Sequence, residues 1–187
     1  MFIQINTKGV KMDRRGFLKL AGIALGLGVT EKTFAFGGAF GNMLNTKETI
    51  VDLDKLREFS KKYDFVVFYK NGTTKTYNGR GIKPLMDHLE HNNFKKAHVY
   101  DKVTGRASAL LLAYGKAGKL YTGRLSKQAI PVLEKYNIDY EADELVDYIE
   151  NPTRTGRCIM ENTSANIDNP KVAYSVLKAK LKELATK

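Results

Sequence analysis

The sequence contains very little cysteine, and this scarcity limits the chemistry open to it. Cys158 is the single cysteine among 187 residues. An internal disulfide is excluded, and so is any site that needs two thiolates from one chain. The chain also lacks the composition of collagen or of a proline-rich segment, because it has 16 glycines and 4 prolines. No internal repeat is visible.

The composition is that of a folded globular chain rather than a disordered one. Hydrophobic residues make up 43% and charged residues 27% of the sequence. A length of 187 residues leaves room for one domain of about 150 residues and an appendage. The formal charge is +11, but the lysines are dispersed over several predicted elements, without a helix-turn-helix pattern or interleaved aromatics. We therefore expect solvated basic faces and no specific nucleic-acid partner.

The N-terminal segment has the pattern of an export signal. Residues 13–19 read Asp-Arg-Arg-Gly-Phe-Leu-Lys, and no charged residue follows from Leu20 to Thr30. This pattern resembles a bacterial twin-arginine signal, and the apolar run is shorter than the ~20 residues of a membrane-spanning helix. An ordinary amphipathic or buried first helix is the alternative interpretation.

We accordingly predict three parts: an export signal over residues 1–37, a linker over 38–50 and one α/β domain over 51–187. The signal would engage the twin-arginine export machinery. The mature chain, without a membrane span, is then expected in the periplasm or cell envelope.

Hydrophobic periodicity and turn signals predict alternating helices and strands after residue 50. Strands that alternate with helices of about 12 residues indicate parallel crossovers, and the Asn71-Gly72 turn adds one hairpin. The fold class is therefore α/β, a three-layer α/β/α sandwich with a mixed five-stranded sheet. Residues 143–150 are ambiguous between helix and strand, and residues 151–157 form a loop. The expected helices are 52–62 (with Asp52 as its cap), Pro84 to about 92, 103–114, 126–136 (capped by Ser126), a short one from about Cys158 and a last one from Pro170; the expected strands are 65–69, 73–77, 97–100, 119–122 and 138–140.

Three stretches of the chain resemble a known family. The resemblance is to the domain of unknown function family 1893 (DUF1893), and it covers roughly residues 50–185. The order of elements is similar to the cytidine-deaminase-like fold, so the resemblance implies that fold. The stretches are Gly79-Arg80-Gly81-Ile82-Lys83-Pro84-Leu85, Asp101-Lys102-Val103-Thr104-Gly105-Arg106-Ala107 and Arg154-Thr155-Gly156-Arg157-Cys158-Ile159-Met160-Glu161.

The resemblance to deaminases does not extend to their zinc site. Zinc deaminases carry His or Cys, then Glu two residues on, at one helix start, and Pro-Cys-x-x-Cys at the next. Those positions here read Gly81-Ile82-Lys83 and Asp101-Lys102-Val103-Thr104, which supply no zinc ligand set. His88 and His91 are expected on or beside the exposed side of their helix, and His98 in a strand. We therefore expect no metal and no cofactor.

Glycine next to arginine recurs where strands are expected to lead into helices. Glycine lets backbone approach a ligand, helix N-termini bind anions, and arginine binds phosphate or carboxylate through two N–H groups. These loops predict a pocket for an anionic small molecule or a nucleotide. Turn glycines and solvated arginines are the alternative. The candidate ligand-binding residues are Arg80, Gly81, Lys83, Gly105, Arg106 and Arg157.

Four further residues are candidates for catalysis. Asp101 and Lys102 precede a predicted helix and could orient a substrate or move a proton, or Asp101 could simply cap that helix. Cys158 lies at a predicted helix start next to Arg157, which favours the thiolate, and Glu161 shares its helix face. A small buried thiol is the alternative for Cys158.

These observations favour an exported, zinc-free, deaminase-like domain that binds an anionic small molecule. One alternative is a metal-free enzyme that uses Cys158 with Asp101 and Lys102. A second alternative is a periplasmic protein-interaction module. The sequence alone does not decide whether the chain is an enzyme.

Overall fold

The computed structural model describes residue 51 and residues 53–186. The predicted export signal (1–37), the predicted linker (38–50) and the predicted helix cap at Asp52 lie outside these residues. In the part of the chain that is described, no helix is long and apolar enough to cross a membrane.

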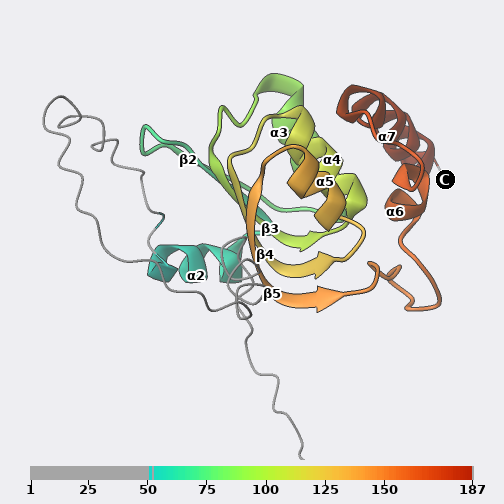
Figure 1. Ribbon diagram of the computed structural model, residues 1–187, viewed down its shortest axis with the longest axis horizontal. Coiled ribbons are helices and arrows are strands. Elements are labelled where there is room, and N and C mark those ends of the chain that lie inside the picture. The colour runs from blue at the N-terminus through green and yellow to red at the C-terminus, as the bar shows by residue number, and fades with distance from the viewer. Residues whose placement is uncertain (1–50, 52, 187) are drawn as a thin grey trace, which may run out of the picture.

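Five strands and six helices of the described region alternate as the sequence predicts. The described region begins with a helix and a hairpin, continues through strand–helix–strand units and ends with two helices (Figure 1). The elements are α2 (Leu53–Lys62), β1 (Phe65–Phe68), β2 (Thr74–Tyr77), α3 (Lys83–His91), β3 (His98–Thr104), α4 (Arg106–Tyr114), β4 (Lys119–Ser126), α5 (Ile130–Lys135), β5 (Asp139–Val146), α6 (Ile159–Ser164) and α7 (Pro170–Ala185).

The strands form one mixed sheet in the order β2-β1-β3-β4-β5. β1 pairs antiparallel with both β2 and β3, whereas β3, β4 and β5 run parallel. The α/β class and the mixed five-stranded sheet predicted from the sequence are therefore confirmed. The parallel half is joined through α4 and α5, because parallel neighbours need a crossover connection.

The two faces of the sheet are covered unequally. On one face, Leu56, Phe59 and Tyr63 from α2 and the segment just after it pack on a small apolar cluster that contains Val66 and Phe68 of β1. The opposite face carries the main core, to which α3, α4, α5, α6 and α7 all contribute (Figure 1). Because successive strand residues point to opposite faces, all four residues of β1 are buried, two in each cluster.

α4 is the central helix of the main core. Six of its nine residues, from Ala107 to Leu112, are buried. A helix that is apolar nearly all round must be surrounded by other elements. Figure 1 shows α4 among α3, α5 and α7, above the sheet. This placement brings the first turn of α4 to the point where β3 ends.

The parallel strands are longer than the sequence predicts, and two helices start later. β3 continues to Thr104 and β4 to Ser126, so α4 begins at Arg106 instead of 103 and α5 at Ile130 instead of 126. Pairing between Thr104 and Leu125 extends both strands, and this long-range contact has no signal in the local pattern. The ambiguous residues 143–146 are likewise held as strand by pairing with β4.

β3 and β4 change the face they present halfway along their length. Leu120 and Leu125 lie in the same core cluster although their spacing of five would place them on opposite faces of a regular strand. In β3, Thr104 contacts Asp101 three residues earlier. Gly123 lies at this bend, where an added Cβ would come within 3.1 Å of the Lys102 carbonyl oxygen. The bend brings Asp101 and Thr104 onto the face that carries α4.

Candidate functional site

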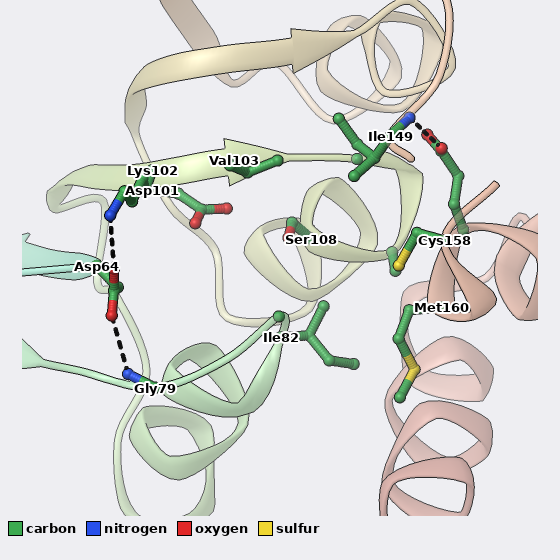
Figure 2. Close-up of a pocket in the computed structure, with 14 residues that line it drawn as sticks. Asp64, Gly79, Ile82, Asp101, Lys102, Val103, Ser108, Ile149, Cys158 and Met160 are labelled. Carbon is green, nitrogen blue, oxygen red and sulfur yellow. Dashed lines mark hydrogen bonds and ion pairs between the residues drawn. The ribbon is translucent and has the colours of Figure 1, made fainter. Parts of the chain in front are cut away.

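A cavity of about 170 Å³ lies between the end of β3, the first turns of α3 and α4, and the start of α6. Five segments that are separate in the sequence line it (Figure 2). We call it the β3–α6 cavity. Its lining residues are Asp64, Gly79, Gly81, Ile82, Asp101, Lys102, Val103, Gly105, Ala107, Ser108, Ile149, Cys158, Met160 and Glu161.

Asp101 is the buried acid on the sheet side of the cavity. It is 5% exposed, and it lies within β3 instead of capping α4 as one sequence interpretation held. Its Oδ2 is 3.0 Å from the Thr104 hydroxyl, and Ser108 of α4 also hydrogen-bonds to the carboxyl group. Burial raises the pKa of Asp101 to about 7, against the opposing effect of the Thr104, Ser108 and Val103 hydrogen bonds.

Two threonine hydroxyl groups, those of Thr104 and Thr122, form a short chain of hydrogen bonds beside Asp101. Thr122 donates its hydroxyl proton to the Arg124 carbonyl at 3.1 Å, and Thr104 donates to the Thr122 hydroxyl at 3.1 Å. Each hydroxyl has one proton, so Thr104 donates either to Thr122 or to the Oδ2 of Asp101. When Asp101 ionises, Thr104 donates to the carboxylate and gives up its bond to Thr122. Burial favours a neutral Asp101 below about pH 7, whereas the hydroxyl donors favour its carboxylate form.

Glu161 is the buried acid on the α6 side. It is 4% exposed, and its Oε2 accepts a hydrogen bond from the Ile149 backbone N–H at 2.6 Å. Its Oε1 has no hydrogen-bond partner. Gly105 lies against this oxygen, because a Cβ at that position would be only 3.2 Å from Oε1 and 3.1 Å from Ile149. Glycine at 105 is thus what allows a buried carboxylate beside the first turn of α4.

A third acid, Asp64, is neutralised at the rim. Its carboxylate accepts from the Gly79 backbone N–H at 3.1 Å and from the Lys102 ammonium at 3.2 Å (Figure 2). The Lys102 side chain is 62% exposed and that of Asp64 is 33% exposed, so the ion pair contributes little stability. Its main effect is to hold the segment before α3 against the end of β3.

Cys158 lines the cavity at the N-cap of α6 and is partly buried. Figure 2 shows its sulfur pointing between Ser108 and Met160. Its backbone N–H donates to the Ile149 carbonyl at 2.7 Å. Arg157, which was expected to favour the thiolate, instead lies over the Tyr148 ring, 4.9 Å from the ring centre.

The predicted site residues divide into two groups. All four catalytic candidates, Asp101, Lys102, Cys158 and Glu161, line the cavity, and so do the glycines at 81 and 105. Gly81 has a φ of +58°, a conformation that favours glycine. The cationic candidates Arg80, Lys83, Arg106 and Arg157 do not line it.

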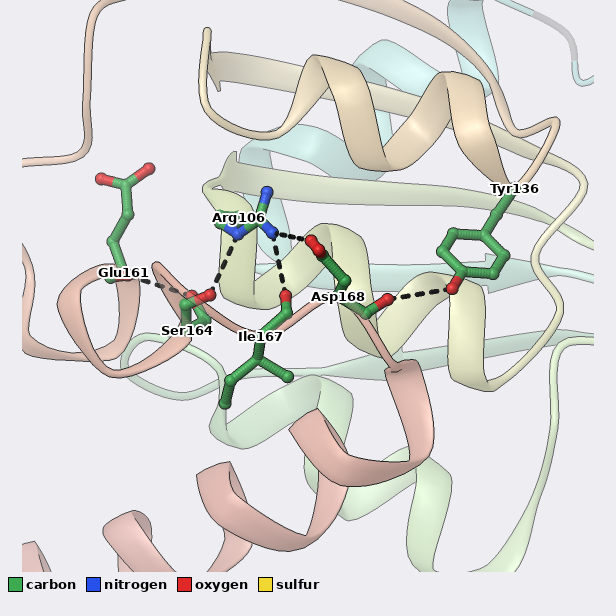
Figure 3. A network of polar contacts seen from close by, with 6 residues as sticks. All are labelled: Arg106, Tyr136, Glu161, Ser164, Ile167 and Asp168. Carbon is green, nitrogen blue, oxygen red and sulfur yellow. Dashed lines mark hydrogen bonds and ion pairs between the residues drawn. The ribbon is translucent and has the colours of Figure 1, made fainter.

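Arg106 serves the C-terminal helices (Figure 3). Its guanidinium donates to the carbonyls of Ser164 at 3.0 Å and Ile167 at 2.9 Å, and to the Asp168 carboxylate at 2.6 Å. Three acceptors from the α6–α7 connection thus satisfy one side chain that is 13% exposed. Lys83 pairs with Asp87 one helical turn away.

Two lining residues with polar side chains have no sequence signal as site residues. Ser108 lies inside an apolar helical run, and Asp64 lies between a helix and a strand. The histidines also differ from expectation, because His88 is completely buried rather than near the exposed side of its helix. Among the described residues, no group of three or more His, Cys, Asp or Glu side chains is arranged to hold a metal ion.

His88 is a structural residue of the main core. Tyr69 donates its hydroxyl proton to the Asn93 carbonyl at 3.1 Å, so the 3.2 Å contact between Tyr69 and His88 is donated by Nε2–H. Tyr77 donates to Nδ1 at 2.9 Å. Burial lowers the pKa of His88 to about 4, so this ring is neutral at pH 7.

Comparisons with known proteins agree with the fold. A crystal structure of a DUF1893 family protein (TM1506) from Thermotoga maritima is similar, with a TM-score of 0.63 and 21% identity over 68% of this chain and 88% of that chain. At this identity the likeness shows the fold alone. The search of curated proteins found no match. The family model described as a domain of unknown function (DUF1893) matches residues 55–181. The chain therefore belongs to the DUF1893 family.

Proposed function

We propose that this domain binds a small molecule in the β3–α6 cavity. The observation that carries the proposal is the pair of buried carboxyl groups, Asp101 and Glu161, which lie 60 positions apart in sequence and line the same cavity. Buried acids are costly for stability, and perturbed acids in a concave site are typical of functional sites. Ile82 and Met160 supply the apolar part of the lining.

The proposed relation to the cytidine-deaminase-like fold rests on where the helices begin. In deaminases the zinc ligands come from two helix starts. Here the starts of α3 and α4 contribute Gly81, Ile82, Gly105 and Ser108 to the cavity. We infer a zinc-free site in the corresponding place. The arginines that led us to expect an anionic ligand do not line the cavity, so they do not support that expectation.

Localisation in the periplasm or cell envelope is part of the proposal. It rests on the paired arginines at positions 14 and 15 and the uncharged segment from Leu20 to Thr30. The test is fractionation of cells that express the full chain. The protein is expected in the periplasmic fraction, and a double Arg14→Lys, Arg15→Lys variant in the cytoplasm. A cytoplasmic location of the unaltered chain would contradict export.

Nuclear magnetic resonance of methionine methyl groups tests the binding site. Met160 lines the cavity, whereas Met86 is buried in the core away from it, so the two methyls are a reporter and its control. The full chain is titrated with a panel of small amines, amidines, carboxylates, sugar phosphates and nucleotides. A ligand should shift Met160 and leave Met86 unmoved. If no compound shifts Met160 at millimolar concentration, the proposed function is wrong.

A metal-free enzyme remains the second candidate. The observation that favours it is that Cys158, Asp101 and Lys102 line one cavity. Cys158 would act as nucleophile and Asp101 as the proton carrier. Iodoacetamide is the test: a fast, pH-dependent modification of Cys158 supports a nucleophile, and modification as slow as for a buried thiol argues against it.

A further inference from the structure

Acids outnumber cations among the residues that line the β3–α6 cavity. Three acids, Asp64, Asp101 and Glu161, face one cation, Lys102, and that cation pairs with Asp64. In the described part of the chain neither Asp101 nor Glu161 forms a salt bridge. An empty cavity of this charge attracts cations and repels anions.

Glu161, which lines the cavity, has an unused acceptor. Oε2 is satisfied by the Ile149 N–H, but the buried Oε1 has no partner. A buried charged acceptor without a donor is costly, and a ligand N–H would recover that cost. The unpaired oxygen therefore selects a ligand that brings hydrogen-bond donors.

The N-terminus of α4, where a bound anion would otherwise be favoured, already has a carboxylate of the protein beside it. α4 begins at Arg106 after Gly105, without a side-chain cap, which would favour a negative group there. The Glu161 carboxylate supplies that negative group, because its Oε1 lies against Gly105. A second anion at the same place would meet the carboxylate at close range.

We propose that the ligand of this cavity is a small organic cation with N–H donors, such as an amine, amidine or guanidine, which donates to Glu161 and is attracted by the ionised form of Asp101. The inference rests on the proposed function, since it names the ligand class of that site. The volume of about 170 Å³ limits the buried part of the ligand to a few heavy atoms. Four other titratable groups line the cavity with Asp101, namely Asp64, Lys102, Cys158 and Glu161.

A cation of this kind should displace a proton on binding. The pKa of Asp101 is about 7, and a positive charge beside it lowers that pKa. If the bound cation requires the carboxylate form, affinity rises about tenfold between pH 6 and pH 8, as the ionised fraction does. Replacement of Asp101 by Asn should remove this dependence.

The experiment is calorimetric and methyl-NMR titration of the full chain with methylguanidine, acetamidine and propylamine at pH 6 and pH 8. Acetate and inorganic phosphate are the anionic controls. The expected result is a cation-induced shift of Met160, tighter binding at pH 8, and proton release detected as a dependence of the heat on the buffer. Glu161→Gln should weaken binding at least tenfold, and the surface control Asp87→Asn should leave it unchanged.

Two outcomes separate this inference from the proposed function. If phosphate or acetate shifts Met160 and the cations do not, the cation inference is wrong and the binding site stands. If no probe of either charge shifts Met160, the proposed function fails and the inference with it. If Glu161→Gln does not fold, the test is the pH dependence of cation affinity, which should be present in the unaltered chain and absent in Asp101→Asn. Equal cation affinity of the unaltered chain at both pH values overturns the inference.

Discussion

Replacement of Asp101 by Asn is expected to stabilise the protein at neutral and alkaline pH. Asp101 is 5% exposed, and burial raises its pKa from 3.8 to about 7. Asparagine has the same shape as the neutral acid and never ionises. Its amide can either accept from or donate to the Thr104 hydroxyl, so the contact with Thr104 is preserved.

The direction of the change in stability with pH follows from proton binding. Because the folded-state pKa is above the unfolded value, the folded protein holds an extra proton between about pH 4 and pH 7. Its stability therefore falls as pH rises through that interval. The full difference of about 3 pKa units corresponds to about 4 kcal/mol, which is an upper magnitude. Asp101→Asn should match the unaltered protein near pH 4 and exceed its free energy of unfolding by several kcal/mol at pH 8.

Urea unfolding at pH 4.5 and pH 8 measures this difference. The titration of His88 affects both proteins equally, so it cancels in the comparison. Asp87→Asn, at a side chain that is 41% exposed, is the matched control and should change stability by less than about 0.5 kcal/mol at either pH. A stability difference that does not grow with pH, or an Asn variant that is less stable at pH 8, would refute the reasoning.

Three further predictions concern the scaffold. The pKa of His88 is lowered from 6.5 to about 4, so the free energy of unfolding should fall by about 3 kcal/mol as pH falls from 6.5 to 4. The ring resonances of His88 in nuclear magnetic resonance spectra should show the Nε2–H tautomer and a titration midpoint near 4. A midpoint near 6.5 would contradict this prediction. Gly118→Ala places a Cβ 2.5 Å from the Lys96 carbonyl oxygen, so urea unfolding should show a loss of about 2 kcal/mol, whereas Gly156→Ala, with nothing nearer than 4.0 Å, should be within about 0.5 kcal/mol of the parent. Arg106→Lys cannot reach three acceptors and should cost about 2 kcal/mol, measured in the same way; an unchanged stability would show that the network of Figure 3 is not formed in solution.

Local pattern was sufficient for the identity and order of the elements. The Asn71-Gly72 turn predicted the hairpin, and Pro170 at the start of α7 is confirmed, with Asn169 accepting hydrogen bonds from the Lys171 and Val172 N–H groups. These features depend on residues within a few positions of one another. Strand lengths were under-predicted, because pairs such as Thr104–Leu125 join residues about twenty positions apart.

Of the predicted site residues, the acids, Cys158 and Lys102 line the cavity, whereas the arginines and Lys83 do not. Asp101, Cys158 and Glu161 do meet at one cavity, as the positions of strand ends and helix starts suggested. The arginines were expected to bind a ligand because each lies next to a glycine in a loop. Arg106 instead donates to the Ser164 and Ile167 carbonyls of the α6–α7 connection.

The amino-acid sequence by itself determined the α/β class, the mixed sheet and the family, because periodicity, turns and family motifs are properties of contiguous residues. Tertiary structure alone decided which polar groups are buried and where each long side chain points. The bend of β3 at Lys102 turns Asp101 and Thr104 to the same side, and Gly105 leaves space for the Glu161 carboxylate. Burial and an unused acceptor are relations between distant segments, so the negative character of the β3–α6 cavity emerges only when the chain is folded.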